Sequence, residues 1–533
     1  PARRAFINDV VCEGCGDCNS SSNCVAVRPL DTPLGRKRVI DQSSCNKDFS
    51  CIEGFCPSFV VVEGGWLRKS ETSLVRAENP ASDLPLPSLP VIVDKYNILL
   101  TGIGGTGVIT VGANLGMAAH LEGKGCSVLD QTGLSQKNGA VMSHIAITND
   151  PDKVLGTRIG TSMSDLVIGF DMVVAAGKDA VNTMSITRTK AVINDHLVPL
   201  AAFAERPDMP LEAGSYKDVV ITALGSGNIS FFDATTQVTK LLGDSMTANI
   251  FQLGYAFQKG FVPLKVESLE QAIRLNNVSV ETNLQAFAWG RVAAADPQRL
   301  NDILGISDES AITEFDIDEF IRERAADLTN YQNKTYARSY LETIKKIEIS
   351  LEEKGLDKDN LLEAVARSLF KLMAYKDEYE VARAYTDVSY RRKLDAQFDG
   401  NYKIKFYFSP PLFAKRDPIT GQALKKEYSS SIIWLLKILA SLKIFRGSIL
   451  DPFGYLSERR KERQLILNYR TLINEVIGNL SSESYDLAIE LLKLPMQIRG
   501  FGHVKDKAIR KFELEERNIL EKFRAISLHQ AGE

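Results

Sequence analysis

The chain has 533 residues, of which 44% are hydrophobic and 25% charged, with a formal net charge of -3. This composition is typical of a globular protein, and the charge balance gives no reason to expect a nucleic-acid partner. At this length we expect about three or four domains. No stretch stays apolar over the roughly 20 residues that a membrane-spanning helix needs. The nearest, Ile432 to Phe445, is interrupted by Lys437 and Lys443 and is expected to be a buried helix.

Cysteine is concentrated near the start of the chain. Every cysteine except Cys126 lies between Cys12 and Cys56. Such crowding indicates disulfides in a small secreted domain, but a metal or cluster site in a large intracellular protein. The chain starts at Pro1 without a basic-then-apolar leader. We therefore expect a cytoplasmic protein that begins partway through a longer gene product or was processed, and we favour a metal or cluster site.

Changes of composition divide the chain into predicted domains. Residues 1–78 are rich in Gly, Ser and Cys and short of core residues, which predicts a small α+β, ferredoxin-like module held by an inorganic group. Residues 79–95 are rich in proline and should form a stiff linker. Residues 96–290 alternate apolar runs with helical patterns, which predicts a Rossmann-like α/β domain with a mainly parallel sheet. Residues 291–533 have helical periodicity and predict a mostly helical domain of unknown role.

Individual elements follow from the same patterns. In the α/β domain we predict a helix at Val108–Glu122. The strands predicted there are Asn97–Thr101, Cys126–Asp130, Asp171–Ala175, Lys190–Asn194 and Asp218–Thr222. The helices predicted in the last domain are Leu361–Met373, Ile432–Leu442, Glu458–Val476 and Tyr485–Leu492, with strands in the aromatic stretch Tyr402–Phe413.

The strongest motif is Cys12-Glu-Gly-Cys15-Gly-Asp-Cys18, followed further along by Cys56-Pro57. Cysteines spaced C-x2-C-x2-C place three thiolates on one face of a [4Fe–4S] cube. A distant cysteine followed by proline supplies the fourth ligand, as in bacterial ferredoxins. The spacing therefore predicts one such cluster.

The remaining residues of this segment leave two questions open. Cys24, Cys45 and Cys51 could bind a second cluster, but only if a ligand other than cysteine completes the site. Gly14 and Gly16 let backbone N–H groups turn toward cluster sulfurs. Structural zinc is the alternative occupant, although zinc sites prefer two separated C-x2-C pairs.

A glycine-rich turn follows the first strand of the α/β domain. Its sequence, Gly102-Ile-Gly104-Gly105-Thr106-Gly107, allows a tight turn and a close approach of a ligand to a helix N-terminus. Asp130 ends the next predicted strand at about the spacing of a ribose-binding acid. Taken alone, this pattern predicts NAD or FAD binding, and the alternative is a turn needed only for helix–sheet packing.

The polar segment from Asp130 to His144 argues against simple dinucleotide use. Loops at the carboxyl ends of parallel strands are where ligands or partner domains bind. Lys137 could act there or be solvated, and His144 could be a hydrogen-bonded strand residue.

Together these motifs resemble a known family. Cys12–Cys18 and Gly35–Cys51 resemble the ferredoxin-like segment of the indolepyruvate ferredoxin oxidoreductase family, in the large fused version of aerobic bacteria. Thr101–Gly107 and Gln131–Lys137 are similar to the gamma domain of 2-oxoacid:ferredoxin oxidoreductases. Ile498–Lys505 is similar to the family's C-terminal region of unassigned role, so the resemblance covers essentially the whole chain.

The resemblance implies a reaction. A 2-oxoacid such as indolepyruvate is decarboxylated on thiamine diphosphate, oxidised through iron–sulfur clusters and released as an acyl-CoA, and ferredoxin is reduced. It also implies that the glycine loop faces coenzyme A, which is a substrate. Gln136 and Lys137 would reach the active site of the partner domains.

One departure bears on the division of labour. The sequence lacks the Gly-Asp-Gly and later Asn with which thiamine enzymes bind the magnesium diphosphate, and Gly243-Asp-Ser lacks the third glycine. We therefore expect thiamine diphosphate and Mg²⁺ on partner domains, upstream or on another chain, in an oligomer. Two other functions stay open: an iron–sulfur NAD or flavin reductase, and a non-catalytic, zinc-stapled assembly subunit.

Overall fold

The structure is a computed structural model that describes residues 3–24, 26–68, 79–133, 139–153, 156–197, 214–305, 315–410 and 424–531. Its internal contacts divide the chain into two compact units. The cysteine unit comprises Pro1–Ile40, Lys47–Trp66 and Ile312–Glu533, and the glycine-loop unit comprises Asp41–Asn46 and Leu67–Ala311. The four-domain division made from composition stays a prediction.

The glycine-loop unit is built on a six-stranded sheet with the order β11-β10-β9-β6-β8-β7. Its strands are β6 (Lys95–Ile103), β7 (Gly125–Thr132), β8 (Ala140–Thr148), β9 (Leu166–Gly169), β10 (Lys190–Asn194) and β11 (Ile229–Phe232). Strands β6, β9, β10 and β11 are parallel, whereas β8 pairs antiparallel with both β6 and β7. The predicted mainly parallel α/β sheet is confirmed, with an antiparallel hairpin at one edge.

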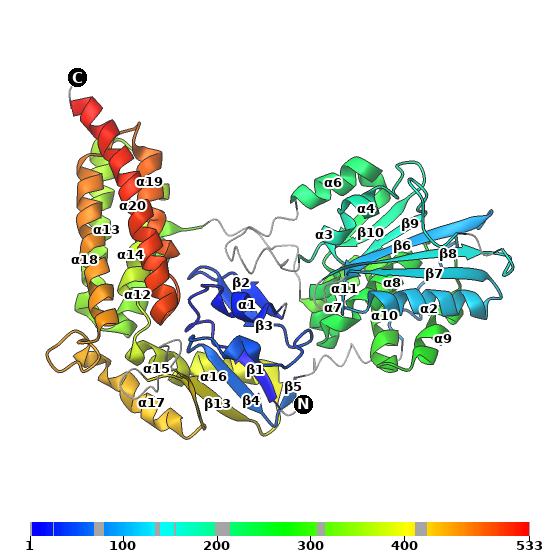
Figure 1. The fold of residues 1–533 in the computed structure, drawn as a ribbon, viewed down its shortest axis with the longest axis horizontal. Helices are drawn as coiled ribbons and strands as arrows, with labels where there is room; N and C mark the ends of the chain where they lie inside the picture. The colour runs from blue at the N-terminus through cyan, green and yellow to red at the C-terminus, as the bar shows by residue number, and fades with distance from the viewer. Residues whose placement is uncertain are drawn as a thin grey trace. The chain divides into compact units, whose positions relative to one another are not determined.

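Helices cover both faces of this sheet, as Figure 1 shows. Ile98 and Leu100 of β6 are fully buried in a core shared with helices on one face, and Leu99 faces a second core on the other. The helices of the first face are α2 (Val108–Leu121), α7 (Ala234–Leu242), α8 (Ala248–Gln258), α9 (Val266–Asn276), α10 (Val280–Ala295) and α11 (Pro297–Leu304). Those of the second are α3 (Met172–Ala175), α4 (Lys178–Val181) and α6 (Gly214–Leu224).

Two predicted strands of this unit are wrong. Asp171 caps the short helix α3, and the strand is β9, which ends two residues before it. Asp218–Thr222 lies inside helix α6, where the side chains of Val219 and Ile221 are exposed. Both segments are short runs of β-branched residues, for which hydrophobic periodicity cannot separate strand from helix.

The cysteine unit contains a four-stranded antiparallel sheet in the order β1-β4-β13-β14. Strands β1 (Arg3–Ile7) and β4 (Phe59–Glu63) flank the cysteine motifs, and β13 (Lys403–Phe408) and β14 (Lys426–Tyr428) come from the last third of the chain. Two small pairs join β2 (Val27–Leu30) to β3 (Lys37–Ile40) and β5 (Trp66–Leu67) to β12 (Phe398–Asp399). The short helix α1 (Asp17–Ser22) follows the first cysteines.

Helices make up the rest of the cysteine unit, and those that begin at Ile317, Lys334, Asp359, Ser457, Tyr485 and Gly502 share one apolar core. The helices of this unit are α12 (Ile317–Tyr331), α13 (Lys334–Lys354), α14 (Asp359–Met373), α15 (Glu378–Thr386), α16 (Val388–Gln397), α17 (Ile432–Ser441), α18 (Ser457–Gly478), α19 (Tyr485–Lys493) and α20 (Gly502–Ala531). The predicted helical C-terminal region is confirmed. Among the described helices, none combines the length and the apolarity that crossing a membrane requires.

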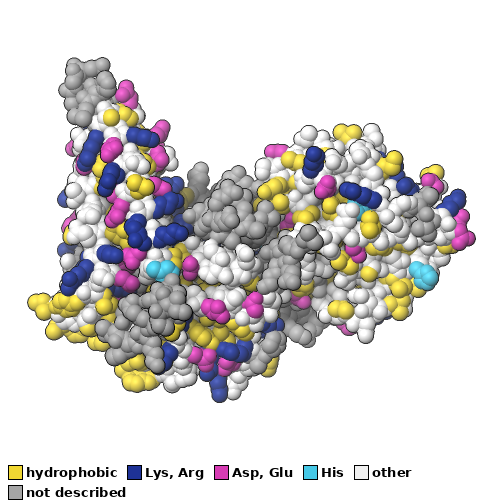
Figure 2. Space-filling view, in the orientation of Figure 1, with side chains coloured by type: hydrophobic (Ala, Val, Ile, Leu, Met, Phe, Trp, Pro, Cys, Tyr) yellow, Lys and Arg dark blue, Asp and Glu magenta, His cyan; other side chains and the backbone are white. Residues whose placement is uncertain are grey.

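The prediction that Ile432–Phe445 is a buried helix is only half right. The segment is helical, but Trp434 is 63% exposed and only Leu436 of α17 is buried. Figure 2 shows apolar side chains gathered over α17 and the loop that follows it, where Ile449 is 88% exposed. Sequence hydrophobicity alone does not distinguish a core from an apolar surface.

Candidate cysteine site and glycine loop

The loop that carries the first three cysteines is turned by glycine. Gly14 and Gly16 have φ values of 69° and 80°, a region that side chains other than glycine rarely adopt. A Cβ atom added at Gly14 would lie 2.0 Å from the carbonyl oxygen of Arg36. The loop therefore needs glycine here, because its backbone passes directly against the β2–β3 hairpin.

The structure brings four predicted ligands together. Burial first, and then the charge of Cys56, raises the pKa of the Cys15 thiol to about 12. Burial and the charge of Cys12 raise the pKa of Cys56 to about 11, and the pKa of Cys18 is raised by burial and by the other three thiols. The four thiols therefore lie within electrostatic range of one another. Their role as ligands stays a prediction.

The surroundings of this group fit an anionic iron–sulfur cluster. The N–H of Gly14 points to the Cys12 sulfur at 3.4 Å, and Ser58 Oγ lies 3.0 Å from the Cys56 sulfur. Polar hydrogens at such positions stabilise negative sulfur. As they stand, no three His, Cys, Asp or Glu side chains within the described ranges are arranged to hold a metal ion.

Positive charge surrounds the thiols. Lys37 and Arg38 act on Cys12, where they oppose the burial that raises its pKa. Lys425 donates a hydrogen bond to the carbonyl of Ile52 at 2.8 Å. Burial lowers the pKa of Lys425 to about 8, while the charges of Cys56 and Asp17, and then of Cys18 and Cys51, oppose the shift. The site is thus built to favour an anion.

Asn19 is a part of the site that sequence reasoning missed. It is 5% exposed; its side-chain oxygen accepts from Arg38 Nε at 3.1 Å, and its amide donates to the Val27 carbonyl at 2.8 Å. These bonds tie helix α1, which also contains Cys18, to the hairpin β2–β3. Only its position next to a cysteine could have singled it out.

The remaining cysteines are divided between the units. Cys24 and Cys51 are buried in the cysteine unit, and Cys51 lies in a short 3₁₀ turn (Ser50–Ile52) that packs against α1. Cys45 lies in the segment Asp41–Asn46, which is counted with the glycine-loop unit. A second cluster held by these residues stays a prediction.

In the glycine-loop unit, the glycines serve packing and turning. A Cβ atom at Gly102 would lie 2.6 Å from the Val108 side chain, so this glycine lets α2 approach β6. Gly105 and Gly107 have φ values of 84° and 92°, and Gly107 caps α2. Added atoms at Gly105 would meet nothing within 4 Å, so the loop is open on this side.

Hydrogen bonds hold the same loop in place. Gly104 N–H donates to the Gly139 carbonyl at 2.9 Å, and the Thr106 hydroxyl donates to the Ile103 carbonyl at 2.8 Å. The Asn249 amide donates to the Thr106 carbonyl at 2.9 Å. The loop is therefore fixed before any ligand arrives.

The position of Asp130 disfavours dinucleotide binding. A ribose-binding acid lies on the strand next to the one that leads into the glycine turn. Here β8 separates β7 from β6, and the Asp130 carboxylate accepts a hydrogen bond from Ser143 at 2.5 Å. Asp130 is therefore one strand too far from the glycine loop to bind a ribose there, and its carboxylate already has a hydrogen-bond partner.

His144 is a hydrogen-bonded strand residue. It is 2% exposed; its Nε2 lies 3.3 Å from Gln131 Oε1, and its Nδ1 accepts from the Ile159 N–H at 3.3 Å. Burial lowers its pKa. Gln136 and Lys137, predicted to face the partner's active site, lie outside the described residues.

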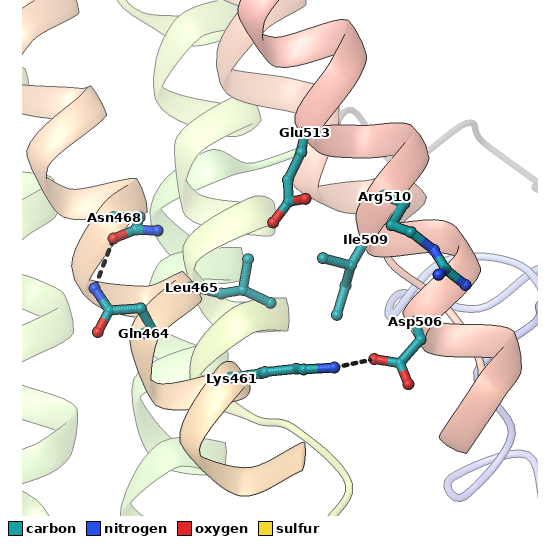
Figure 3. Close-up of a pocket in the computed structure, with 8 residues that line it drawn as sticks. All are labelled: Lys461, Gln464, Leu465, Asn468, Asp506, Ile509, Arg510 and Glu513. Atoms are coloured by element: carbon teal, nitrogen blue, oxygen red, sulfur yellow. Dashed lines mark hydrogen bonds and ion pairs between the residues drawn. The ribbon is translucent and has the colours of Figure 1, made fainter. Parts of the chain in front are cut away.

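The helical region has a groove of 320 Å³ between α18 and α20. Figure 3 shows the Lys461 ammonium pointing to the Asp506 carboxylate, with which it pairs at 2.6 Å, and Leu465 and Ile509 forming the apolar floor. The groove is open and mixed in charge, so it does not define a ligand class.

Comparison with known proteins assigns the glycine-loop unit. Residues 97–293 match the family described as pyruvate ferredoxin/flavodoxin oxidoreductase. These residues are a domain of the 2-oxoacid:ferredoxin oxidoreductase family. Residues 317–518 match a family of unknown function, DUF6537.

Curated relatives are similar to this chain over almost their own whole length. Indolepyruvate oxidoreductase subunit IorB of Pyrococcus horikoshii is 25% identical over 211 residues, which cover 38% of this chain and 97% of that protein. The subunit of the same name from Methanothermobacter thermautotrophicus is 28% identical over 208 residues, covering 38% and 99%.

Solved structures cover a similar share of the chain. The gamma subunit of a keto/oxoacid ferredoxin oxidoreductase from Geobacter sulfurreducens is 22% identical, covers 37% of this chain and 98% of that one, and has a TM-score of 0.27. The 2-oxoglutarate:ferredoxin oxidoreductase of Magnetococcus marinus, with 2-oxoglutarate, coenzyme A and succinyl-CoA bound, is 16% identical, covers 38% and 31%, and has a TM-score of 0.28.

Proposed function

We propose that this chain is the electron-transfer and gamma-domain portion of a 2-oxoacid:ferredoxin oxidoreductase. In this proposal Cys12, Cys15, Cys18 and Cys56 hold a [4Fe–4S] cluster. The observation that carries it is the electrostatic coupling of these four thiols, with the Gly14 N–H and Ser58 Oγ next to two of their sulfur atoms, on a chain that also contains the oxidoreductase domain. When bound, the cluster supplies the single-electron steps that side chains cannot perform.

The residues around the thiols have distinct tasks in this proposal. Gly14 and Gly16 turn the loop that carries the thiols, and the Gly14 N–H is directed at the Cys12 sulfur. The hydrogen bond from Arg38 to Asn19 holds the loop against the β2–β3 hairpin. Burial of Cys12 and Cys18 keeps water away from the site.

The finer parts of the proposal concern substrate and partners. We propose an aryl 2-oxoacid, such as indolepyruvate, as the substrate, with an acyl-CoA and CO₂ as products and ferredoxin as the electron acceptor. The names of the curated relatives support this choice. Thiamine diphosphate and Mg²⁺ would be bound by partner domains. Gln136, Lys137 and the loop Gly102–Gly107 would face the coenzyme A side of the complete enzyme.

Replacing one thiol tests the cluster assignment. Cys15→Ala should lower the iron and acid-labile sulfide of anaerobically purified protein and abolish ferredoxin reduction by the complete enzyme, with decarboxylation partly retained. Cys126→Ala is the matched control, because Cys126 lies in β7 of the other unit, and it should keep wild-type iron. Equal iron in both variants would remove Cys15 from the ligand set.

A further inference from the structure

The cysteine segment and the region of unknown function form one sheet. Strand β4 lies between β1 and β13, with Val60 opposite Phe6 on one side and Phe406 on the other (Figure 1). Phe406 is fully buried. Without β13, the backbone groups of β4 would lose their hydrogen-bond partners along that edge. The segment that carries the thiols therefore depends on residues 403–408 for its fold.

Helix α15 of the same region contacts both ends of the cysteine segment. The Tyr385 hydroxyl donates to the Pro57 carbonyl at 2.6 Å, one residue after Cys56. The Asn8 amide, ahead of the first cysteine, donates to the Ala384 carbonyl at 3.0 Å. Adjacent residues of one helix thus hold the two parts of the chain that bear the thiols.

A third contact reaches a thiol-bearing residue itself. A Cβ atom added at Gly500 would lie 3.5 Å from the Cβ of Cys15, and Gly500 has a φ of 101°. Gly502 packs against the ring of Phe55, the residue before Cys56. The loop before α20 therefore packs directly against the segment that carries the thiols.

The region also brings positive charge to the thiols. Lys425, just before β14, donates a hydrogen bond to the carbonyl of Ile52, the residue after Cys51, at 2.8 Å, and the charges of Cys56 and Cys18 act on it. Lys371 of α14 lies 3.4 Å from Glu13, the residue after Cys12, and the two side chains are 17% and 11% exposed. Burying an ammonium group costs free energy that a nearby anion offsets. Glu13 supplies that compensation for Lys371, and for Lys425 an anionic occupant of the thiol group would add to the charge of Asp17.

We infer that the region of unknown function, residues 317–518, completes the binding site of the cluster: it encloses the cysteine loop and supplies, through Lys425, positive charge that sets the reduction potential. The inference rests on the proposed function, in which the four thiols hold the cluster. A thiolate-ligated cluster is negative and becomes more negative on reduction. A fixed positive charge therefore stabilises the reduced state more than the oxidised state and raises the potential.

Removing the Lys425 charge from the full chain tests the inference. In a redox titration followed by electron paramagnetic resonance, Lys425→Gln should lower the ratio of reduced to oxidised cluster about tenfold at a fixed potential, a shift of about 59 mV for one electron. Lys425→Arg, which keeps the charge, should titrate close to wild type. Lys426→Gln is the matched control, because it removes the same charge from the exposed neighbouring side chain, and should leave the potential unchanged.

The outcomes separate the inference from the proposed function. Equal potentials for Lys425→Gln and Lys426→Gln, in proteins that hold the cluster, would overturn the inference and leave the proposed function standing. A wild-type protein without iron and sulfide would instead remove the proposed function. If Lys425→Gln folds without the cluster and Lys425→Arg contains it, the result supports the inference. If neither variant contains the cluster, the result contradicts the inference.

A second pair of variants tests the enclosure if Lys425→Gln does not fold. Tyr385→Phe removes the hydroxyl that holds Pro57 and should speed the release of iron to a chelator severalfold. Tyr390→Phe is the control, because this nearby hydroxyl is buried without a hydrogen-bond partner among the described residues. Equal release rates in the two variants would contradict the inference.

Discussion

At the scale of single residues, Glu462 shows how the cysteine unit buries charge. Its carboxylate pairs with Arg459 at 2.6 Å and also with Lys505, and the three side chains are 5%, 9% and 17% exposed. Burial alone would raise the pKa of Glu462. The positive charges of Lys505 and Arg459 outweigh it and hold the pKa below its ordinary value of 4.5.

Glu462→Gln should therefore destabilise the protein at neutral pH. The variant leaves Lys505 without its ion-pair partner, whereas Arg459 keeps its pair with Glu378, so the loss should be about 3 kcal/mol of the free energy of unfolding. Because the folded pKa is lowered, this stabilisation is present above pH 4.5 and is lost as the pH falls toward the folded pKa. Denaturant unfolding should show that the difference in unfolding free energy between wild type and variant becomes smaller as the pH is lowered toward the folded pKa of Glu462. The control Glu458→Gln, 43% exposed, should cost little, and an equal cost would refute the account.

Gly14 gives a second test at this scale. Gly14 and Gly123 have nearly the same φ, 69° and 68°, but only Gly14 has a neighbouring backbone in the way of a side chain. Gly123→Ala should cost about 1–2 kcal/mol for the left-handed conformation. Gly14→Ala should cost more in denaturant unfolding and also lower the iron content. Similar effects of the two substitutions would show that the loop is not packed as described.

Some residues of the site are visible in the sequence and others are not. Cys12, Cys15, Cys18 and Cys56 follow from their spacing, and the glycines between them from the need for a turn. Lys425 and Asn19 have no local signal, because their roles depend on which distant segments the fold brings to the thiols. Sequence spacing identifies candidate ligands but not the charges that surround them.

At the scale of elements, helices α8 and α10 pack unusually closely. A Cβ atom at Gly290 would lie 1.8 Å from the Phe251 carbonyl oxygen, and one at Gly254 would lie 2.0 Å from the Phe287 carbonyl oxygen. Each helix thus presents a glycine to the backbone of the other. This crossing anchors the face of the sheet that α2 also covers.

Gly290→Ala should push the two helices apart. In most helices this change is stabilising, but here the added methyl group should cost about 1–3 kcal/mol of unfolding free energy through overpacking. Gly478→Ala, in α18, meets nothing within 4 Å and should be neutral or slightly stabilising. Thermal unfolding of both variants makes the comparison, and a stabilised Gly290→Ala would contradict the close crossing.

Elements with long periodic patterns were predictable, whereas short apolar runs gave mixed results: Asn97–Thr101 and Lys190–Asn194 are strands as predicted, and two others are helical. Val108–Leu121 and Ser457–Gly478 carry enough turns for the helical period to show. Asp171–Ala175 and Asp218–Thr222 are rich in β-branched residues and were predicted as strands, although Asp171 caps a helix. The difference is length, because a run of five residues fits either period.

At the scale of the whole molecule, each unit has an apolar core of its own. Leu369 of α14 and Leu253 of α8 are both fully buried, one in each unit. The joining of the cysteine segment to the last third of the chain could not be predicted, because β4–β13 pairing leaves no trace in local sequence. Composition pointed instead to a separate cysteine module.

Destabilising one core should affect the thiol site only if that core belongs to the cysteine unit. Leu369→Ala and Leu253→Ala should each cost about 2–5 kcal/mol. Leu369→Ala should also speed iron release to a chelator, because the thiols share a unit with α14. Leu253→Ala should release iron at the wild-type rate. Faster release from Leu253→Ala alone would contradict the division into units.

The central claim is that four thiols near the start of the chain hold a redox-active iron–sulfur cluster. The most direct test is iron and acid-labile sulfide analysis of the wild-type chain purified without oxygen, with electron paramagnetic resonance before and after reduction. The account predicts a brown protein with iron and sulfide in equal amounts and a signal that one-electron reduction creates. A colourless, folded protein that contains zinc or no metal would contradict it.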